Sequence, residues 1–389
     1  MNYISIENIK NGVYSFSSIS PLRHFELQTE LEKENIFVDL NGSSKTFLSV
    51  NTDKVTEILK DKISDNSKIF YGCLLSQHNF HQFIDKIYQI TDSLNFAHEK
   101  VYFYTCSIDA VELYNQWLEF RPDVKKIQII QISAWEFYTK FNSKLQTNPS
   151  YQIGLKEKKF LCFNRRVKPH KLALILFLSK HNLLDKCYIS FFMEDHSDSL
   201  SGHTKQELFS WLNSQFRYDQ LMSDLINEYD VLKDNLPLKL NINNTYAKRY
   251  VDDDDLEYFS NSYFSLVTEN IFFADLEFNG QQQRFLSENT FKPIVMKHPF
   301  MLLASVRSLA YLKKLGYRTF NGLIDESYDT IENDTDRFLA VTNEIQRLCY
   351  QTDNEWLSWQ QEILPIVEYN YQLLYEKNQD NFIIEKFYS

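Results

Sequence analysis

One basic segment of the sequence has the residue types and spacing that bind phosphate. The segment Asn164–Lys171 contains two arginines and two lysines and lies between an expected strand and an expected helix. A helix N-terminus offers unpaired N–H groups and the positive end of the helix dipole, and arginine adds paired donors for phosphate oxygens. Arg165, Arg166 and Lys168 are therefore candidate ligands of a diphosphate. A basic surface turn is the alternative interpretation.

Two carboxylates further along the chain could accept hydrogen bonds from sugar or ribose hydroxyls. Glu269 ends an expected strand, and Glu288 follows Ser287 where a helix is expected to begin. Lys292 lies one helical turn beyond Glu288 and adds a cation. The alternatives are ordinary helix capping for Ser287 and Glu288, and an ion pair with a nearby cation for Glu269.

Strands and helices alternate around these residues. Short apolar runs predict strands over 68–75, 101–106, 126–133, 159–163, 186–192, 263–268 and 300–304. Apolar patterns of helical period lie between them, including 83–94, 109–120, 134–145, 170–184, 287–296 and 308–315, and two amphipathic helices are expected over 336–377. Such alternation is typical of parallel sheets with helical crossovers. A polar, proline-containing segment at 146–150 is a candidate linker. We predict an α/β fold with two Rossmann-like domains, residues 1–150 and 151–389, and C-terminal helices.

Composition narrows the class of protein. A net charge of −11 disfavours a protein dedicated to nucleic acid or anionic membrane. The apolar runs are too short for a membrane span, and the first residues lack the features of a signal peptide. Five scattered cysteines without a Cys-x-x-Cys pair indicate reduced thiols. We therefore expect a cytoplasmic protein without a membrane span. The chain has 8 glycines and contains neither of the glycine-rich phosphate-binding motifs G-x-G-x-x-G and G-x-x-x-x-G-K-[ST].

Several short motifs follow one another in a recognisable order. They are the basic segment, Thr268-Glu269-Asn270, the segment 285–294, His298-Pro299-Phe300 and Gly316–Asp329. In this order, over residues 158–340, they resemble a group of mostly uncharacterised phage and giant-virus proteins that is distantly similar to the α1,3-fucosyltransferases. The resemblance implies a GT-B-like fold, in which two Rossmann-like domains face a cleft, and a viral protein of the host cytoplasm. Asn289 stands where the fucosyltransferases have a lysine, which leaves the donor sugar open.

The resemblance implies a glycosyltransferase that uses a nucleotide sugar as co-substrate and no further cofactor. The acceptor would be a glycan or a modified base of DNA, bound by residues 1–150, and the donor would be bound by residues 151–389. The residues implied to contact the donor are Arg165, Arg166, Lys168, Glu269, Ser287, Glu288 and Lys292.

An inverting transfer also needs a general base near the acceptor hydroxyl. His78 and His81 follow the strand expected over 68–75, and Asp109 follows the strand expected over 101–106. A histidine here could equally be a loop or core residue, and a retaining mechanism would need no separate base. The His-x-x-His spacing has no apparent third ligand, so we expect no metal.

Two other classes of protein stay open at this point. The first is a non-catalytic nucleotide- or glycan-binding protein derived from a transferase fold, which Asn289 favours. The second is a nucleic-acid-directed enzyme that holds phosphates with the basic segment Lys156–Lys171. Steep salt dependence of binding would distinguish the second class.

Overall fold

The structure is a computed structural model, and part of the chain is described in it. The described residues are 2–5, 36–39, 51–73, 80–131, 145–146, 148–164, 167–191, 204–238, 240, 251–273, 284 and 286–379. No helix among these residues is both long and apolar enough to span a bilayer.

The chain divides into two compact units. Unit 1 comprises Met1–Tyr138, Asp275–Phe285 and Asp380–Ser389, and unit 2 comprises Thr139–Ala274 and Leu286–Gln379. The boundary predicted after residue 150 lies later in the chain than this division. The reason is that the expected linker bonds to unit 2: the N–H of Gln146 lies 3.2 Å from both carboxylate oxygens of Asp253, and the hydroxyl of Tyr371 donates to Asn148.

Unit 1 contains a parallel sheet whose strands are ordered as in the sequence. The strands are β1 (Asn2–Ser5), β2 (Ile36–Asp39), β3 (Ile69–Cys73), β4 (Val101–Thr105) and β5 (Gln128–Gln131). The connecting helices are α3 (Thr52–Lys60), α4 (Phe80–Ser93) and α5 (Ala110–Glu119). Each strand is added to the sheet on the same side of the strand before it. Right-handed crossovers therefore place these helices on one face of the sheet. Phe83, Ile87, Phe103 and Trp117 belong to the core between them.

Most of the elements predicted for unit 1 are confirmed. Strands β3, β4 and β5 and helices α4 and α5 lie where the apolar patterns placed them. Strands β1 and β2 and helix α3 occur in the first sixty residues, where no clear apolar period predicts elements. The helix predicted over 134–145 lies outside the described residues except for Leu145.

The order in which strands are added to the sheet of unit 2 reverses at the centre of the sheet. Its strands are β6 (Lys158–Asn164), β7 (Cys187–Phe191), β8 (Ser262–Thr268) and β9 (Phe300–Leu303), all parallel, in the order β7-β6-β8-β9. From β6 the chain moves to one side to form β7, and β8 and then β9 add on the other side. In open α/β sheets, ligands bind at the carboxyl ends of the strands where the order reverses. In unit 2 this switch point lies between β6 and β8.

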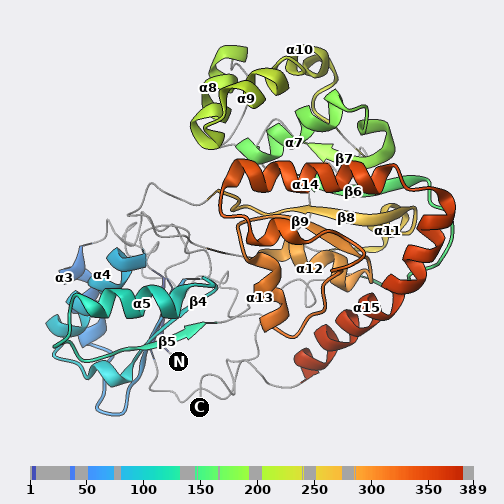
Figure 1. Cartoon of the computed structure of the whole chain (residues 1–389). Coiled ribbons are helices and arrows are strands. Elements are labelled where there is room, and N and C mark those ends of the chain that lie inside the picture. Colours follow the sequence, from blue (N-terminus) through green and yellow to red (C-terminus); the bar gives the residue numbers. More distant parts are fainter. Residues whose placement is uncertain are drawn as a thin grey trace. The chain divides into compact units, whose positions relative to one another are not determined.

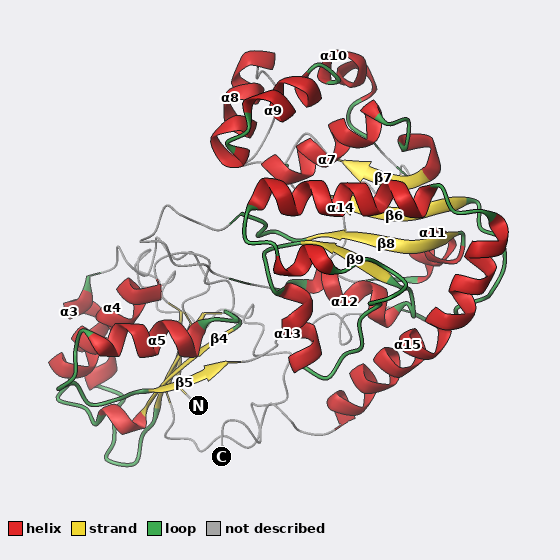
Figure 2. Ribbon diagram, in the orientation of Figure 1, coloured by secondary structure: helices red, strands yellow, loops and turns green. Residues whose placement is uncertain are grey.

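Helices cover both faces of this sheet. The helices of unit 2 are α7 (Pro169–Lys180), α8 (Lys205–Phe216), α9 (Asp219–Ile226), α10 (Tyr229–Leu232), α11 (Leu256–Ser260), α12 (Glu288–Val295), α13 (Ser308–Lys314), α14 (Asp334–Cys349) and α15 (Asp353–Gln379). The crossovers through α7 and α12 run in opposite directions, so these two helices lie on opposite faces. Helix α14 packs with α7, and α15 packs with α12 (Figures 1 and 2). The predicted α/β fold with parallel sheets and C-terminal helices is confirmed.

Candidate functional site

Polar side chains from both central strands meet at the switch point of unit 2. Asn164 ends β6, Thr268 ends β8, and both are buried. The Thr268 hydroxyl donates to Asn164 Oδ1, and Asn164 Nδ2 donates to Cys162 Sγ at 3.2 Å. The two strand ends are thereby joined by side-chain hydrogen bonds. We call the surrounding set the switch-point site; it comprises Asn164, Lys168, His170, Lys171, Thr268, Glu269, Ser287, Glu288, Thr290 and Lys292.

Glu269, which follows β8, is fully buried and connects this strand to α12. Its Oε1 accepts hydrogen bonds from the Ser287 N–H at 3.1 Å and from the Thr290 hydroxyl, and its Oε2 accepts one from the Asn270 N–H at 3.3 Å. Burial raises the pKa of the Glu269 carboxyl, against the effect of the two hydrogen bonds to Oε1, and the nearby Glu288 raises it further. Both oxygens are thus used within the chain, which indicates a positioning role. Direct contact of Glu269 with a donor stays a prediction.

Helix α7 begins at the switch point without a capping side chain. Its N-cap residue is Lys168, whose side chain makes no capping hydrogen bond, and its first residue is Pro169. Most helices begin with Ser, Thr, Asp or Asn, whose side chain accepts from an N–H of the first turn. The N-cap residue of α7 therefore supplies no side-chain acceptor to the N–H groups of the first turn, an arrangement suited to an anion.

Lys171, in the first turn of α7, is buried, with 2% of its surface exposed. Burial lowers its pKa to about 8; Lys168 lowers it too, while Glu269, Cys162 and Glu288 act in the opposite direction. A buried ammonium group is costly unless it meets an anion or several acceptors. Lys171 was missed as a donor-binding candidate in the sequence. The signal that could have found it is a lysine of the basic segment that stands directly before the apolar run Leu172–Leu178 of α7.

His170 is a neutral side chain beside Lys171. Burial and the charge of Lys171 lower the pKa of His170 well below its ordinary value. Its Nε2 lies 2.9 Å from the Glu269 carbonyl oxygen, so Nε2 carries the proton and donates. Its ring stacks on Phe272 at 5.3 Å, and its buried Nδ1 accepts no hydrogen bond from the described residues. His170 therefore retains an unused acceptor next to Glu269.

The structure brings together most of the predicted donor-binding residues. Ser287 is the N-cap of α12 and accepts from the Asn289 N–H at 3.2 Å. Glu288 begins α12 and is half-buried, and Lys292 lies buried one turn later. Arg165 and Arg166, which separate β6 from Lys168 in sequence, lie outside the described residues.

Two other motif residues have structural roles in unit 2. His298 is buried; its Nδ1 lies 2.8 Å from Ser265 Oγ and its Nε2 lies 3.0 Å from the Ser262 carbonyl oxygen, and burial lowers its pKa to about 3. Asp329 accepts from the N–H groups of Leu309 and Ala310 at 2.8 and 3.0 Å and so caps α13. Neither residue is available to a ligand at the switch point.

The three residues predicted as general bases belong to unit 1, and two of them are described. His81 lies in the first turn of α4, half-buried, with Nε2 3.1 Å from the Leu113 carbonyl oxygen. Asp109, the N-cap residue of α5, is buried, and its carboxylate is paired with Arg284. His78 lies outside the described residues. Both carboxylate oxygens of Asp109 accept hydrogen bonds from Arg284, so this geometry favours a structural role for Asp109.

We expect Asp109→Ala to lower the stability of unit 1 by about 3 kcal/mol, because it leaves the guanidinium of Arg284 without its carboxylate. The Asp109 oxygens accept from Arg284 Nε at 2.8 Å and from the Arg284 N–H at 2.9 Å, and the Ile108 N–H donates to the Arg284 carbonyl. Faster hydrogen exchange in peptides covering β4 and α5 would show the loss. If Asp109 is instead the proton acceptor, Asp109→Asn would leave exchange unchanged and abolish turnover.

No protein-family model and no curated protein matches the chain. Among solved structures, the chain is similar to the N-terminal domain of trehalose-6-phosphate phosphatase from Candida albicans, with 12% identity, a TM-score of 0.43, and coverage of 91% of this chain and 69% of that one. It is also similar to a UDP-forming α,α-trehalose-phosphate synthase from Burkholderia xenovorans, with 9% identity, a TM-score of 0.42, and coverage of 97% and 81%. The function of this chain has to be argued from its own residues.

Proposed function

We propose that the protein is a glycosyltransferase that moves a sugar from a nucleotide-sugar donor to a glycan or a modified DNA base. The observation that carries the proposal is the buried Lys171 beside the uncapped start of α7, at the point where the strand order reverses. A diphosphate would satisfy both the ammonium group and the first-turn N–H groups. As the sugar leaves, negative charge grows on the diphosphate, and fixed cations lower the energy of that transition state.

The rest of the site would orient the donor. Glu288 is half-buried at the start of α12 and could accept from a sugar or ribose hydroxyl, and His170 Nδ1 offers a second acceptor. Glu269 would act through Ser287 and Thr290 by fixing the start of α12. Unit 1 would then bind the acceptor, with His78 or His81 as candidates for the general base.

Release of nucleoside diphosphate from a panel of nucleotide sugars, followed by mass spectrometry, tests the proposal. We expect Arg166→Ala and Glu288→Ala each to abolish turnover while the circular dichroism spectrum stays native. Lys180→Ala is the matched control, because Lys180 lies at the other end of α7. Full activity in both site variants would remove the assignment.

The lowered pKa of Lys171 predicts a pH dependence of binding. Diphosphate affinity should fall as pH rises past about 8, because the ammonium loses its proton there in the ligand-free protein. Stability should change in the opposite sense. Between the folded pKa of about 8 and the ordinary lysine pKa of 10.5, the unfolded chain holds more protons, so the free energy of unfolding should rise with pH. Calorimetric titration with UDP or GDP between pH 7 and 9.5 checks the first effect, and a flat affinity profile would contradict it.

A non-catalytic nucleotide-binding protein is the second candidate. It is favoured by Asn289, which stands where the α1,3-fucosyltransferases have a lysine. It is also favoured by Glu269, whose two carboxylate oxygens both accept hydrogen bonds within the chain. This candidate predicts binding of a nucleoside diphosphate without release from any nucleotide sugar. The turnover assay therefore separates the two candidates.

A further inference from the structure

A cavity of about 800 Å³ lies in unit 2 away from the switch-point site. Trp359 of α15 lines it and meets Trp356 at 5.1 Å between rings; Trp356 in turn stacks at 4.1 Å on Tyr263, near the start of β8. The switch point lies at the other end of β8, which has 7 residues. At about 3.3 Å per residue, the two sites are separated by roughly 20 Å.

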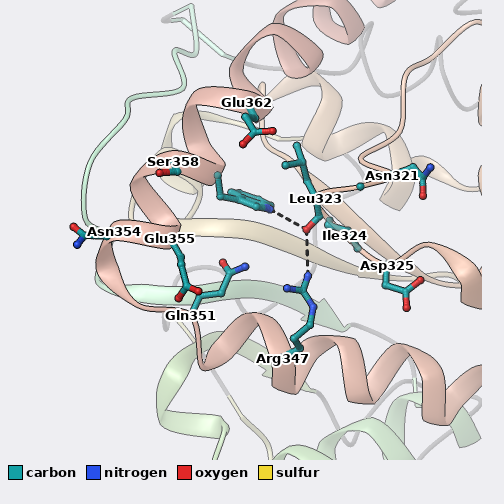
Figure 3. Close-up of a pocket in the computed structure, with 12 residues that line it drawn as sticks. Asn321, Leu323, Ile324, Asp325, Arg347, Gln351, Asn354, Glu355, Ser358 and Glu362 are labelled. Carbon is teal, nitrogen blue, oxygen red and sulfur yellow. Dashed lines mark hydrogen bonds between the residues drawn. The ribbon is translucent and has the colours of Figure 1, made fainter.

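The wall of this cavity is fixed by hydrogen bonds. The Leu323 carbonyl oxygen accepts from Trp359 Nε1 and from the guanidinium of Arg347, each at 3.2 Å (Figure 3). Gly322, just before it, has φ +92, a conformation that favours glycine. The segment carrying Leu323 is held further by Glu326, which accepts from the Phe320 N–H at 2.6 Å. These contacts form a turn that shapes a cavity in advance of any ligand.

The charge of the cavity excludes a phosphate ligand. Arg347 is the one cation among the residues that line the cavity, and Glu344 neutralises it through bonds of 2.6 and 2.7 Å. Asp325, Glu355 and Glu362 add three carboxylates to the lining. Repulsion from these groups would oppose a nucleotide, and the cavity is therefore not a second donor site.

The remaining lining residues suit a molecule rich in hydroxyls. The carboxamides of Asn321, Gln351 and Asn354 both donate and accept, and the carboxylates accept. Gln351 Oε1 is shielded from solvent and accepts no hydrogen bond from the described residues. Trp359 and Leu323 add apolar surface to the lining. From this combination we infer that the cavity binds a neutral saccharide, whose hydroxyls meet the polar groups and whose C–H faces pack on the apolar ones.

Saturation-transfer NMR on the full-length protein tests the inference, with glucose, galactose, N-acetylglucosamine and maltose as probes at pH 7. We expect transfer to at least one sugar, with an affinity that falls about three- to tenfold in Gln351→Ala and in Glu362→Ala, as expected for one lost hydrogen bond. Glu362 is exposed, so its variant should fold normally. Gln361→Ala, one residue away on α15 and outside the lining, is the matched control and should bind as the wild type does.

Four results would overturn the inference. Three are absence of transfer to all four sugars, equal affinity in both variants and the control, and displacement of the sugar by saturating UDP or GDP, which would place it at the switch point. Displacement by spermidine at low millimolar concentration would show that the cavity prefers cations, and this too would overturn it. The sugar signal does not depend on nucleotide binding, so failure of the proposed function would be seen separately.

Discussion

Lys171→Met should weaken nucleoside diphosphate binding strongly without destabilising the protein. Methionine is apolar and of similar length, so it fits a site where 2% of the lysine surface is exposed. The fall in the Lys171 pKa from 10.5 to about 8 means that the folded state disfavours the charged amine. At about 1.4 kcal/mol per pKa unit, this penalty is on the order of 3 kcal/mol at neutral pH, and the variant would regain part of it. A charge-assisted hydrogen bond to the diphosphate would be lost, lowering affinity by about 10- to 100-fold.

Urea unfolding and calorimetric titration on the same samples measure the two effects together. A residue that costs stability and contributes to binding is typical of functional sites. The control is Lys180→Met at the exposed end of α7, which should change neither quantity. A Lys171→Met protein that is less stable and still binds nucleotide would show that Lys171 has only a structural role.

Arg337→Ala should lower the stability of unit 2 by about 3–5 kcal/mol, because a buried ion pair loses one partner. Arg337 of α14 is 1% exposed and pairs with Asp334. Its guanidinium donates to the carbonyl oxygens of Phe272 at 2.7 Å, Ile331 at 2.8 Å and Ala304 at 3.2 Å. The carbonyls of Phe272 and Ala304 follow β8 and β9, so one side chain holds the carboxyl end of the sheet.

Thermal and urea denaturation check this loss, which is large against a typical total stability of about 5–15 kcal/mol. Arg307→Ala is the matched control, because Arg307 and Glu332 form an ion pair with more than half of each side chain exposed (59% and 52%). Such surface pairs contribute about 0–1 kcal/mol. Equal losses in the two arginine variants would contradict the role assigned to Arg337.

The strands and helices of unit 2 were predictable because each has a clear apolar period. Strands β6 to β9 and helices α7, α12, α13, α14 and α15 lie close to their predicted ranges. The order of the strands was not predictable, because it depends on which edges pair and leaves no periodic signal. That order is what locates the switch point. The division into units could not be predicted from the sequence either, because unit 1 includes Arg284, which pairs with Asp109 although the two residues are 175 positions apart.

The candidate site was predictable in part. Ser287, Glu288 and Lys168 could be proposed because each lies at the start of a helix, where phosphate groups and hydroxyls bind; their contact with a donor stays a prediction. The buried partners were not found: Lys171 and His170 lie within an apolar helix, and Thr290 gains its role only by meeting Glu269. Burial of a charged residue follows from tertiary packing, which a single sequence does not record.

The most direct test of the central claim is a thermal-shift titration of the full-length protein with UDP, GDP, CMP, ADP and dTDP at millimolar concentration. Because a ligand stabilises the state that binds it, we predict that one nucleoside diphosphate raises the melting temperature by several degrees. The same nucleotide should raise the melting temperature of Lys171→Met clearly less than that of the wild type. If no nucleotide shifts the folded wild-type protein, or if the shift is as large in Lys171→Met, the switch-point site does not bind a nucleotide-sugar donor.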